Sequence, residues 1–254
     1  RALRIEAYKK IRQPDPEWQS WEYLQLGDCL VAAGLFHAAL DYTERYLESA
    51  QHDLSDTMNL QTYRHLLTRL GRYDKAIDLW TELIAARPDD PIAVGERALL
   101  YSRTGQYEKA EQDLTELRKV FPRSFPELYH MYWRRDVDAA KAYFTWLEGR
   151  KNLQPLYKYW GCFLLADVEG GISYVEEEIS RGVSAILPVN PAQVRLQVTR
   201  PLPQSISREV EQHPRFQAIL KQFGLDDTWR DELMAMANEL TDVTGIHVQL
   251  DDAR

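Results

Sequence analysis

The chain has 254 residues, a formal net charge of −8 at pH 7 and 44% hydrophobic residues, which is typical of a soluble globular protein with a sizeable core. The acidic excess argues against a nucleic-acid-binding role, because such binding depends on Lys and Arg side chains that neutralise phosphates. No apolar run approaches the roughly 18 residues of a membrane-spanning helix, and no signal-like segment opens the chain, so we expect a cytoplasmic protein that does not enter a membrane.

Residues 1–19 begin with an amphipathic pattern that ends at the Pro14-Asp15-Pro16 break. The pattern is typical of the second helix of a hairpin whose first helix is missing, so we interpret 1–19 as part of a preceding, incomplete repeat. This interpretation predicts that the chain is a fragment of a longer protein. A trimmed terminus or a cleaved tag is the alternative.

A self-similar pattern with a period of about 34 residues occupies residues 20–124. Its marker, Gly-x-Tyr/Phe-x-x-Ala, begins at Gly34, Gly71 and Gly105. Apolar residues recur at helical spacing around each marker, and Pro88 and Pro122 follow the second and third copies. Three copies in phase indicate three copies of one structural unit.

Each copy predicts a pair of antiparallel helices. The glycine ends the first helix, where a positive φ closes the turn without steric cost. The alanine of the marker, at Ala39, Ala76 and Ala110, is expected where the second helix crosses the first closely. One hairpin cannot bury its apolar stripe alone, so neighbouring hairpins must cover it, and the expected fold is an all-α solenoid.

With these residues the chain resembles the tetratricopeptide repeat (TPR) family over residues 20–124. The resemblance implies a right-handed superhelix of antiparallel helix pairs, in which the first helix of each pair lines a concave groove. It also implies a protein–protein interaction module that binds a peptide or a partner protein in that groove. No cofactor, no metal site and no catalytic site are expected.

The regular pattern loosens after Pro122. Residues 125–184 are expected to form two divergent TPR-like pairs, the first with Arg134-Arg135-Asp136 in place of the glycine and the second with a turn at Gly170-Gly171. Residues 185–212 contain Pro188, Pro191, Pro201 and Pro203 and are interpreted as a linker, in which Ala192 to Val198 could form one short helical turn. Residues 213–254 are expected to form capping helices and a tail.

The string from Pro214 to Leu225, Pro-Arg-Phe-Gln-x-Ile-Leu-x-x-x-Gly-Leu, is similar to the closing segment of bacterial multidomain regulators. In those proteins a TPR-rich C-terminal region follows a class III cyclase domain or a winged-helix DNA-binding domain. The similarity implies a ligand-sensing or self-association role inside a larger signalling enzyme or transcription regulator. The 254 residues contain neither effector domain, so their activities are not expected here, and the oligomeric state is left open.

The resemblance also implies where a partner binds. The expected partner-binding residues are Asp28, Gln61, His65, Arg69, Ser102, Arg103, Tyr129, Tyr132 and Trp133. The first helices of the second and third copies carry more arginines than acids, whereas residues 106–121 are acidic, so the groove is expected to be the more positive surface. Guanidinium groups pair with carboxylates at two points, which favours an acidic peptide. The alternative is that these arginines form a solvated face.

An aromatic-rich stretch runs from Tyr129 to Trp160. Helical phase directs several of its rings, Phe144 and Trp160 among them, toward the core, so packing is the main expectation for the stretch. Tyr129, Tyr132 and Trp133 are the exceptions, because aromatic side chains with polar tips are favoured in binding surfaces.

Three further patterns limit the function. The six histidines form no His-Glu-x-x-His motif, and the consecutive carboxylates of Glu176-Glu177-Glu178 point in different directions on a helix, so catalysis is not expected. Cys29 and Cys162 lie in apolar helical stretches and are expected to be buried and unbridged. Some TPR domains hold a chaperone's acidic C-terminus with a lysine and an asparagine, but Gly95 and Leu99 occupy those places here, so that binding mode is not expected.

Overall fold

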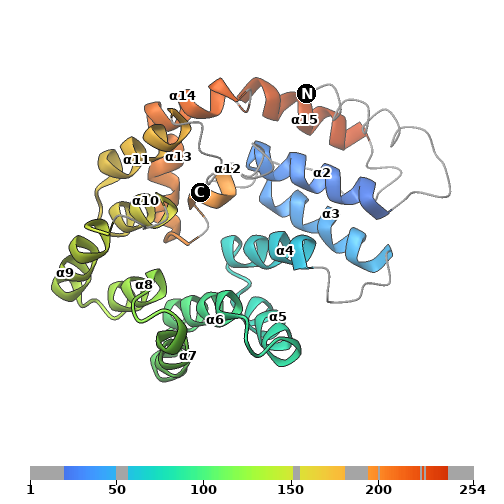
Figure 1. Cartoon of the computed structure of the whole chain (residues 1–254). Helices are drawn as coiled ribbons and strands as arrows, with labels where there is room; N and C mark the ends of the chain where they lie inside the picture. Colours follow the sequence, from blue (N-terminus) through green and yellow to red (C-terminus); the bar gives the residue numbers. More distant parts are fainter. Residues whose placement is uncertain are drawn as a thin grey trace. The chain divides into compact units, whose positions relative to one another are not determined.

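The computed structural model describes residues 20–49, 57–150, 155–180, 194–199, 201–223, 225 and 227–239 (Figure 1). Within these ranges the regular elements are all helices, so the prediction of an all-α chain is confirmed. None of the helices in the described ranges is long and apolar enough to cross a membrane. The chain divides into two compact units, unit 1 with Arg1–Leu70, Val189–Thr199 and Glu211–Arg254, and unit 2 with Gly71–Pro188 and Arg200–Val210.

Unit 1 is built around the hairpin of α2 (Ser20–Ala33) and α3 (Phe36–Ser49), which lie side by side (Figure 1). Three further helices pack on this hairpin: α4 (Thr57–Arg69) contacts α3, while α12 (Val194–Thr199) and α15 (Asp227–Glu239) contact α2. The remaining helix, α14 (Pro214–Gln222), buries Phe216 and Leu220 completely. The core of the α2–α3 hairpin is also fully buried: Leu30, Leu40 and Tyr42 have no exposed surface.

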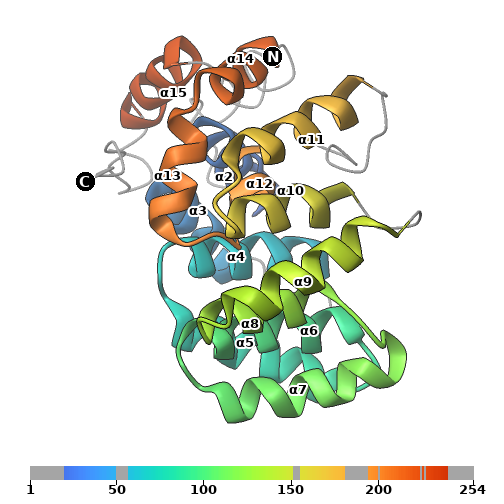
Figure 2. The ribbon, with the colours of Figure 1, turned by 90° about the vertical axis from the view of Figure 1, so that its left-hand side faces the viewer.

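Unit 2 contains consecutive helical hairpins. Between Gly71 and Pro188 its helices are α5 (Tyr73–Ala86), α6 (Pro91–Arg103), α7 (Tyr107–Val120), α8 (Phe125–Trp133), α9 (Val137–Glu148), α10 (Pro155–Leu164) and α11 (Val168–Ser180). The first helices of the pairs contact one another in succession, α6 with α8 and α8 with α10, and each also contacts its own second helix (Figure 2). We call α6, α8 and α10 the first-helix layer. Stacked hairpins of this kind are the arrangement that the repeat pattern predicts.

The turns of the hairpins share one backbone feature, a residue with positive φ. The glycines at 34, 71 and 105 have φ values of 79°, 75° and 75°, which confirms their predicted role in the turns. In the divergent pairs Arg135, with φ 62°, and Ala166, with φ 64°, take the same conformation without being glycine. The hairpin turns of the divergent pairs therefore keep the backbone conformation of the repeat, although the sequence there no longer shows the repeat glycine.

The turn expected at Gly170-Gly171 is wrong, because both glycines lie inside α11. The chain turns at Ala166 instead, where the N–H of Ala166 donates to the carbonyl of Phe163 at 3.1 Å. Asp167 then stabilises the start of α11, because its Oδ1 accepts a hydrogen bond from the N–H of Gly170 at 2.9 Å.

Helix α13 (Gln204–Gln212) forms where the sequence predicts a linker. The helix begins directly after Pro203, so Pro201 and Pro203 precede it and do not interrupt it. The carbonyl of Pro203 accepts from the N–H of Ser207 at 2.9 Å, which is the first turn of this helix. The short α12 lies within the same range, between Pro191 and Pro201.

Small and apolar residues of the repeat lie where the sequence predicts them. Ala39, Ala76 and Ala110 have no exposed surface. Both cysteines are free and buried, with 7% of Cys29 and 4% of Cys162 exposed, so the prediction of buried, unbridged cysteines is confirmed. Burial raises the pKa of the Cys162 thiol to about 12.

We expect Arg135→Gly to raise the free energy of unfolding by up to about 1 kcal/mol. The left-handed conformation costs a non-glycine residue roughly 1–2 kcal/mol, and the flexibility of glycine in the unfolded chain offsets about half of that gain. Arg134→Gly is the matched control, because Arg134 has φ −73° and gains no relief. Urea unfolding followed by circular dichroism should show opposite signs for the two variants; equal losses of stability would contradict the strain at Arg135.

Candidate functional site

Four of the predicted partner-binding residues belong to unit 1. Asp28 is half-buried in α2 and His65 is 2% exposed in α4. Gln61 also lies in α4, but its side chain is outside the described part of the chain. Arg69 ends α4, and its Nη2 donates to Oε1 of Glu211 at 2.8 Å while its Cζ lies 5.0 Å from the ring centroid of Phe36. The charge of Arg69 is therefore already matched by a carboxylate of the same chain.

The other five belong to unit 2. Ser102 is fully buried, its hydroxyl donates to the carbonyl of Ala98 at 2.8 Å, and it shares a hydrogen bond of 2.8 Å with Nδ1 of His130. Ser102 thus joins α6 to α8 from the packed side. Tyr129 is 1% exposed, whereas Arg103, Tyr132 and Trp133 are half-buried. Partner contact at the predicted positions stays a prediction.

One face of α6 remains accessible. Ile92, Glu96, Leu99 and Arg103 follow one another at helical spacing, and none of the four is fully buried. Ile92 is the most exposed of them, at 63%. Of the residues between them, Ala93, Gly95, Ala98, Leu100 and Ser102 are buried, whereas Val94, Arg97 and Tyr101 are half-buried. The accessible face ends at Arg103, beside the aromatic side chains of α8.

Arg103 and four aromatic residues, Tyr73, Tyr129, Tyr132 and Trp133, form a group that we call the Arg103 cluster. The Cζ atom of Arg103 lies 5.1 Å from the ring centroid of Tyr73 and 5.8 Å from that of Trp133. The Trp133 ring contacts Tyr129 at 6.0 Å and Tyr132 at 5.6 Å, the latter edge to face. The guanidinium is thus held by cation–π contacts with rings from α5 and α8.

The electrostatics of Arg103 differ from those of Arg97, the other arginine of the first-helix layer. Within the described part of the chain Arg103 forms no ion pair with a carboxylate, and its neighbours are aromatic rings and the hydroxyl of Tyr129. Arg97, two turns earlier on α6, donates to both carboxylate oxygens of Asp113, at 2.9 and 2.7 Å. Arg103 consequently carries a positive charge that these residues do not neutralise.

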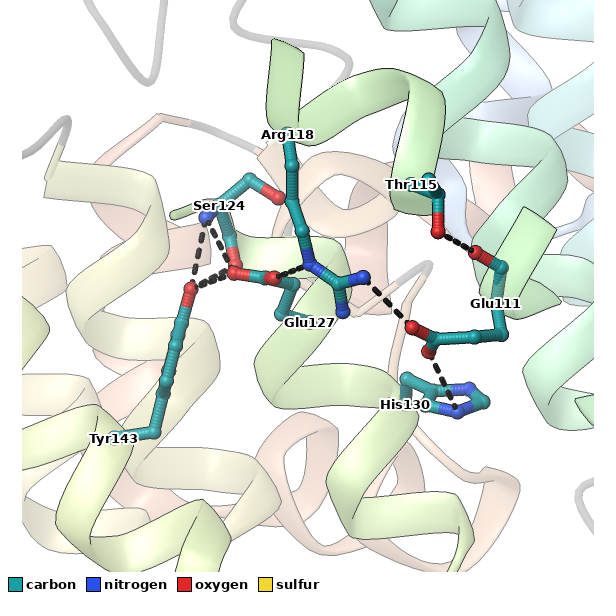
Figure 3. Close-up of polar contacts among 7 residues, drawn as sticks. All are labelled: Glu111, Thr115, Arg118, Ser124, Glu127, His130 and Tyr143. Carbon is teal, nitrogen blue, oxygen red and sulfur yellow. Dashed lines mark hydrogen bonds and ion pairs between the residues drawn. The ribbon is translucent and has the colours of Figure 1, made fainter. Parts of the chain in front are cut away.

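A polar network fixes α8, the helix that carries three residues of the Arg103 cluster (Figure 3). At its centre, Glu127 accepts hydrogen bonds from Nε of Arg118 at 2.5 Å and from the hydroxyl of Tyr143. Glu127 also accepts from the backbone N–H of Ser124 at 3.3 Å, which caps the start of α8. One carboxylate therefore connects α8 to α7 and α9.

The same network continues along α7. Nη1 of Arg118 donates to Glu111 at 2.7 Å, and this hydrogen bond lowers the pKa of the Glu111 carboxyl. Nε2 of His130 lies 3.8 Å from the other oxygen of Glu111. Burial lowers the pKa of His130, so the ring is neutral at pH 7. Burial, with Glu127 as a second cause, raises the pKa of Tyr143.

The end of α8 is held separately, because the hydroxyl of Tyr107 donates to the backbone carbonyl of Trp133 at 3.0 Å. Together with the network at Glu127, this bond fixes both ends of a nine-residue helix. The rings of Tyr132 and Trp133 are therefore presented on a rigid support.

Sequence reasoning missed two parts of this site. The capping-box pattern Ser124-Phe125-Pro126-Glu127 is readable in the sequence and would have identified Glu127. The sequence marks Tyr73 only as a residue of the repeat, since nothing local indicates that Arg103 lies over its ring. Among the described residues, no group of three or more His, Cys, Asp or Glu side chains is placed to hold a metal ion.

Comparison with known proteins identifies one part of the chain. Residues 65–125 match the family model of the tetratricopeptide repeat. A stretch of 63 residues is 40% identical to the heat-shock protein cognate (HSC) co-chaperone sgt12 of Aspergillus fumigatus, and it spans 25% of this chain but only 17% of that protein. A solved structure of a tetratricopeptide repeat protein from Parabacteroides merdae aligns with this chain at 16% sequence identity and a TM-score of 0.47. The alignment covers 92% of this chain and 91% of the Parabacteroides chain.

Proposed function

We propose, from the tetratricopeptide repeat at residues 65–125, that the chain is a protein-interaction module that binds a segment of a partner protein on its first-helix layer. The observation that carries the proposal is the accessible face of α6, which leads through Leu99 to the Arg103 cluster. Tyr, Trp and Arg are the residues that most often dominate binding energies at protein interfaces. No catalytic step is needed for this function.

The co-chaperone relative supports a protein partner, because the name of that protein describes a protein that assists a chaperone. The partner of this chain is expected to bind differently from a chaperone tail held by lysine and asparagine. Gly95 is buried and packs against Pro126, since a Cβ atom there would lie 3.3 Å from Cγ of Pro126. The place of the missing clamp residue is thus used for contact between α6 and α8.

A second candidate function is a ligand-sensing or self-association domain of a bacterial signalling enzyme or transcription regulator. Its support is the string that begins at Pro214, which forms α14 and a turn in which the N–H of Leu225 donates to the carbonyl of Leu220 at 2.8 Å. Light scattering on the purified chain tests the self-association part. A monomer at all concentrations would favour the first candidate.

We expect Leu99→Arg to weaken peptide binding about tenfold or more. The test uses a peptide selected on the wild-type chain from a displayed random library, with affinities measured by calorimetry. An arginine at 99 places a long charged side chain on the accessible face of α6, and tenfold corresponds to about 1.4 kcal/mol. Gln112→Arg adds the same side chain to an exposed position on α7 and is the matched control. Equal affinities for both variants would contradict binding at the first-helix layer.

A further inference from the structure

Two arginine side chains lie on one tryptophan ring of α9. The Cζ atom of Arg123, in the loop before α8, lies 4.1 Å from the ring centroid of Trp146. The Cζ atom of Arg150, just after α9, lies 4.6 Å from the same centroid. The two guanidinium carbons are therefore no further apart than these distances combined, 8.7 Å. We call these three residues the Trp146 cluster; all belong to unit 2, and none lies on a helix of the first-helix layer.

The Trp146 cluster carries two positive charges without a carboxylate partner. Within the described part of the chain neither Arg123 nor Arg150 forms an ion pair or a side-chain hydrogen bond, and both are exposed. The preceding cations on α7 behave differently, because Arg118 and Lys119 are each paired with glutamates. The guanidinium N–H groups of the cluster are therefore open to an acceptor from outside these residues.

The ring between the two arginines has a fixed support. Trp146 is half-buried and contacts the ring of Tyr143, with the centroids 6.0 Å apart. The hydroxyl of Tyr143 is held in turn, because it donates to Glu127 and accepts from the backbone N–H of Ser124 at 2.9 Å (Figure 3). An arginine stacked on an aromatic ring loses less side-chain freedom when its planar fork binds an anion. The cluster thus presents its donors on a surface that is already formed.

We infer that the Trp146 cluster binds the phosphate group of a phosphorylated serine, threonine or tyrosine on a partner protein. Such a phosphate carries a charge of about −1.5 to −2 and three strong acceptor oxygens, which matches two unpaired guanidinium groups. Its oxygens accept from arginine at about 2.7–2.9 Å, so one phosphate can bridge two guanidinium groups at this separation. A carboxylate carries one charge and would leave the second arginine unmatched.

The surroundings of the cluster favour a protein over a nucleic acid or a membrane. Val120 and Phe121, just before Arg123 in the chain, are 60% and 48% exposed, so they offer apolar contacts to residues that flank the phosphorylated one. Nucleic acids and anionic membranes are bound by larger groups of Lys and Arg. The chain as a whole has a net charge of −8, which opposes binding to a polyanion. Two arginines suit a single phosphate group.

The test follows the indole N–H resonance of Trp146 by nuclear magnetic resonance, assigned as the signal that Trp146→Phe removes. The probe is acetyl-Leu-phosphoserine-Leu-amide, compared with the same tripeptide carrying serine or glutamate and with inorganic phosphate. We expect the phosphorylated peptide to shift the signal saturably and the serine peptide to leave it unchanged. The glutamate peptide and inorganic phosphate should bind more weakly. A deoxythymidine decamer and vesicles of phosphatidylcholine with phosphatidylserine test the other sources of phosphate.

Substitution of the arginines tests the site itself. Arg123→Gln and Arg150→Gln should each weaken binding of the phosphorylated peptide about threefold or more, and the double variant about tenfold or more, because each removes a charged donor at an exposed site. Arg72→Gln removes the same charge from an exposed position before α5 and is the matched control. Urea midpoints of all variants separate loss of binding from loss of folding. The comparison of the peptides needs only the wild-type chain.

Four results would overturn the inference: a glutamate peptide or inorganic phosphate that binds as tightly as the phosphorylated peptide, a response that survives in the folded double variant, a decamer that binds more tightly per phosphate group, or vesicles that do so. The proposed function is tested separately, because Leu99→Arg should leave binding of the phosphorylated peptide unchanged. A loss of that binding in folded Leu99→Arg would place the phosphate on the first-helix layer and remove the Trp146 cluster as its site.

Discussion

Gly171→Ala is expected to lower the free energy of unfolding by about 2 kcal/mol. A Cβ atom at this position in α11 would overlap the ring of Phe163 on α10. Phe163 has no exposed surface, so its ring cannot swing aside without opening the α10–α11 hairpin. Overpacking of a core costs typically 1–3 kcal/mol and occasionally more, and the better helix propensity of alanine, about 1 kcal/mol, offsets only part of that.

The neighbouring glycine provides the control. A Cβ atom at Gly170 would meet only the carboxylate end of Asp167, which is exposed and flexible. Gly170→Ala should therefore change stability by no more than about 1 kcal/mol, because improved helix propensity balances a displaced capping bond. Urea unfolding followed by far-ultraviolet circular dichroism measures both variants. Equal effects at the two positions would mean that Gly171 is not the point of close approach between α10 and α11.

Glu127→Ala should lower the free energy of unfolding by about 3 kcal/mol. The side chain of Glu127 is only 7% exposed, and its removal leaves Arg118 and Tyr143 without their common acceptor. Loss of one partner from a buried charged network costs about 3–5 kcal/mol. We take the lower end, because Arg118 is 37% exposed and keeps its hydrogen bond to Glu111.

Glu116→Ala is the control for this variant. Glu116 pairs with Lys119, but both side chains are more than 60% exposed, so the expected change is below about 0.5 kcal/mol. Glu127→Gln should fall between the two, because an amide retains an acceptor oxygen for the start of α8. Thermal and urea unfolding measure all three variants. A loss at Glu127 no larger than at Glu116 would contradict a role of the network in fixing α8.

The Glu127 variants also connect stability to binding. Glu127 fixes the helix that carries Tyr132 and Trp133. A variant that holds α8 less firmly should therefore let these two rings occupy a wider range of positions. Binding of the peptide selected on the wild-type chain is then expected to weaken in folded Glu127→Gln, although Glu127 itself belongs to the network and not to the Arg103 cluster. The effect should be smaller than that of Leu99→Arg, which changes the accessible face of α6 directly.

The repeat glycines show what local sequence can predict. A positive φ is cheap for glycine and costly for other residues, so Gly34, Gly71 and Gly105 identify their turns directly. Arg135 and Ala166 adopt the same backbone conformation without any sequence signal. There the packing of the flanking helices imposes the turn, and Gly171, which looked like a turn residue, serves instead as a contact with Phe163.

The sequence by itself determined the all-α class, the hairpin period and the buried cysteines, because the class and the cysteines depend on local apolar patterns and the period on the recurrence of one marker along the chain. Only the tertiary structure decided which of two equivalent arginines pairs with a carboxylate of the same chain. Arg69 and Arg103 occupy equivalent places in the pattern, yet Glu211, 142 residues further along the chain, pairs with Arg69. No such partner reaches Arg103 among the described residues. Pairing of charges depends on which distant segments folding brings together, and the periodic pattern of the repeats does not predict those contacts.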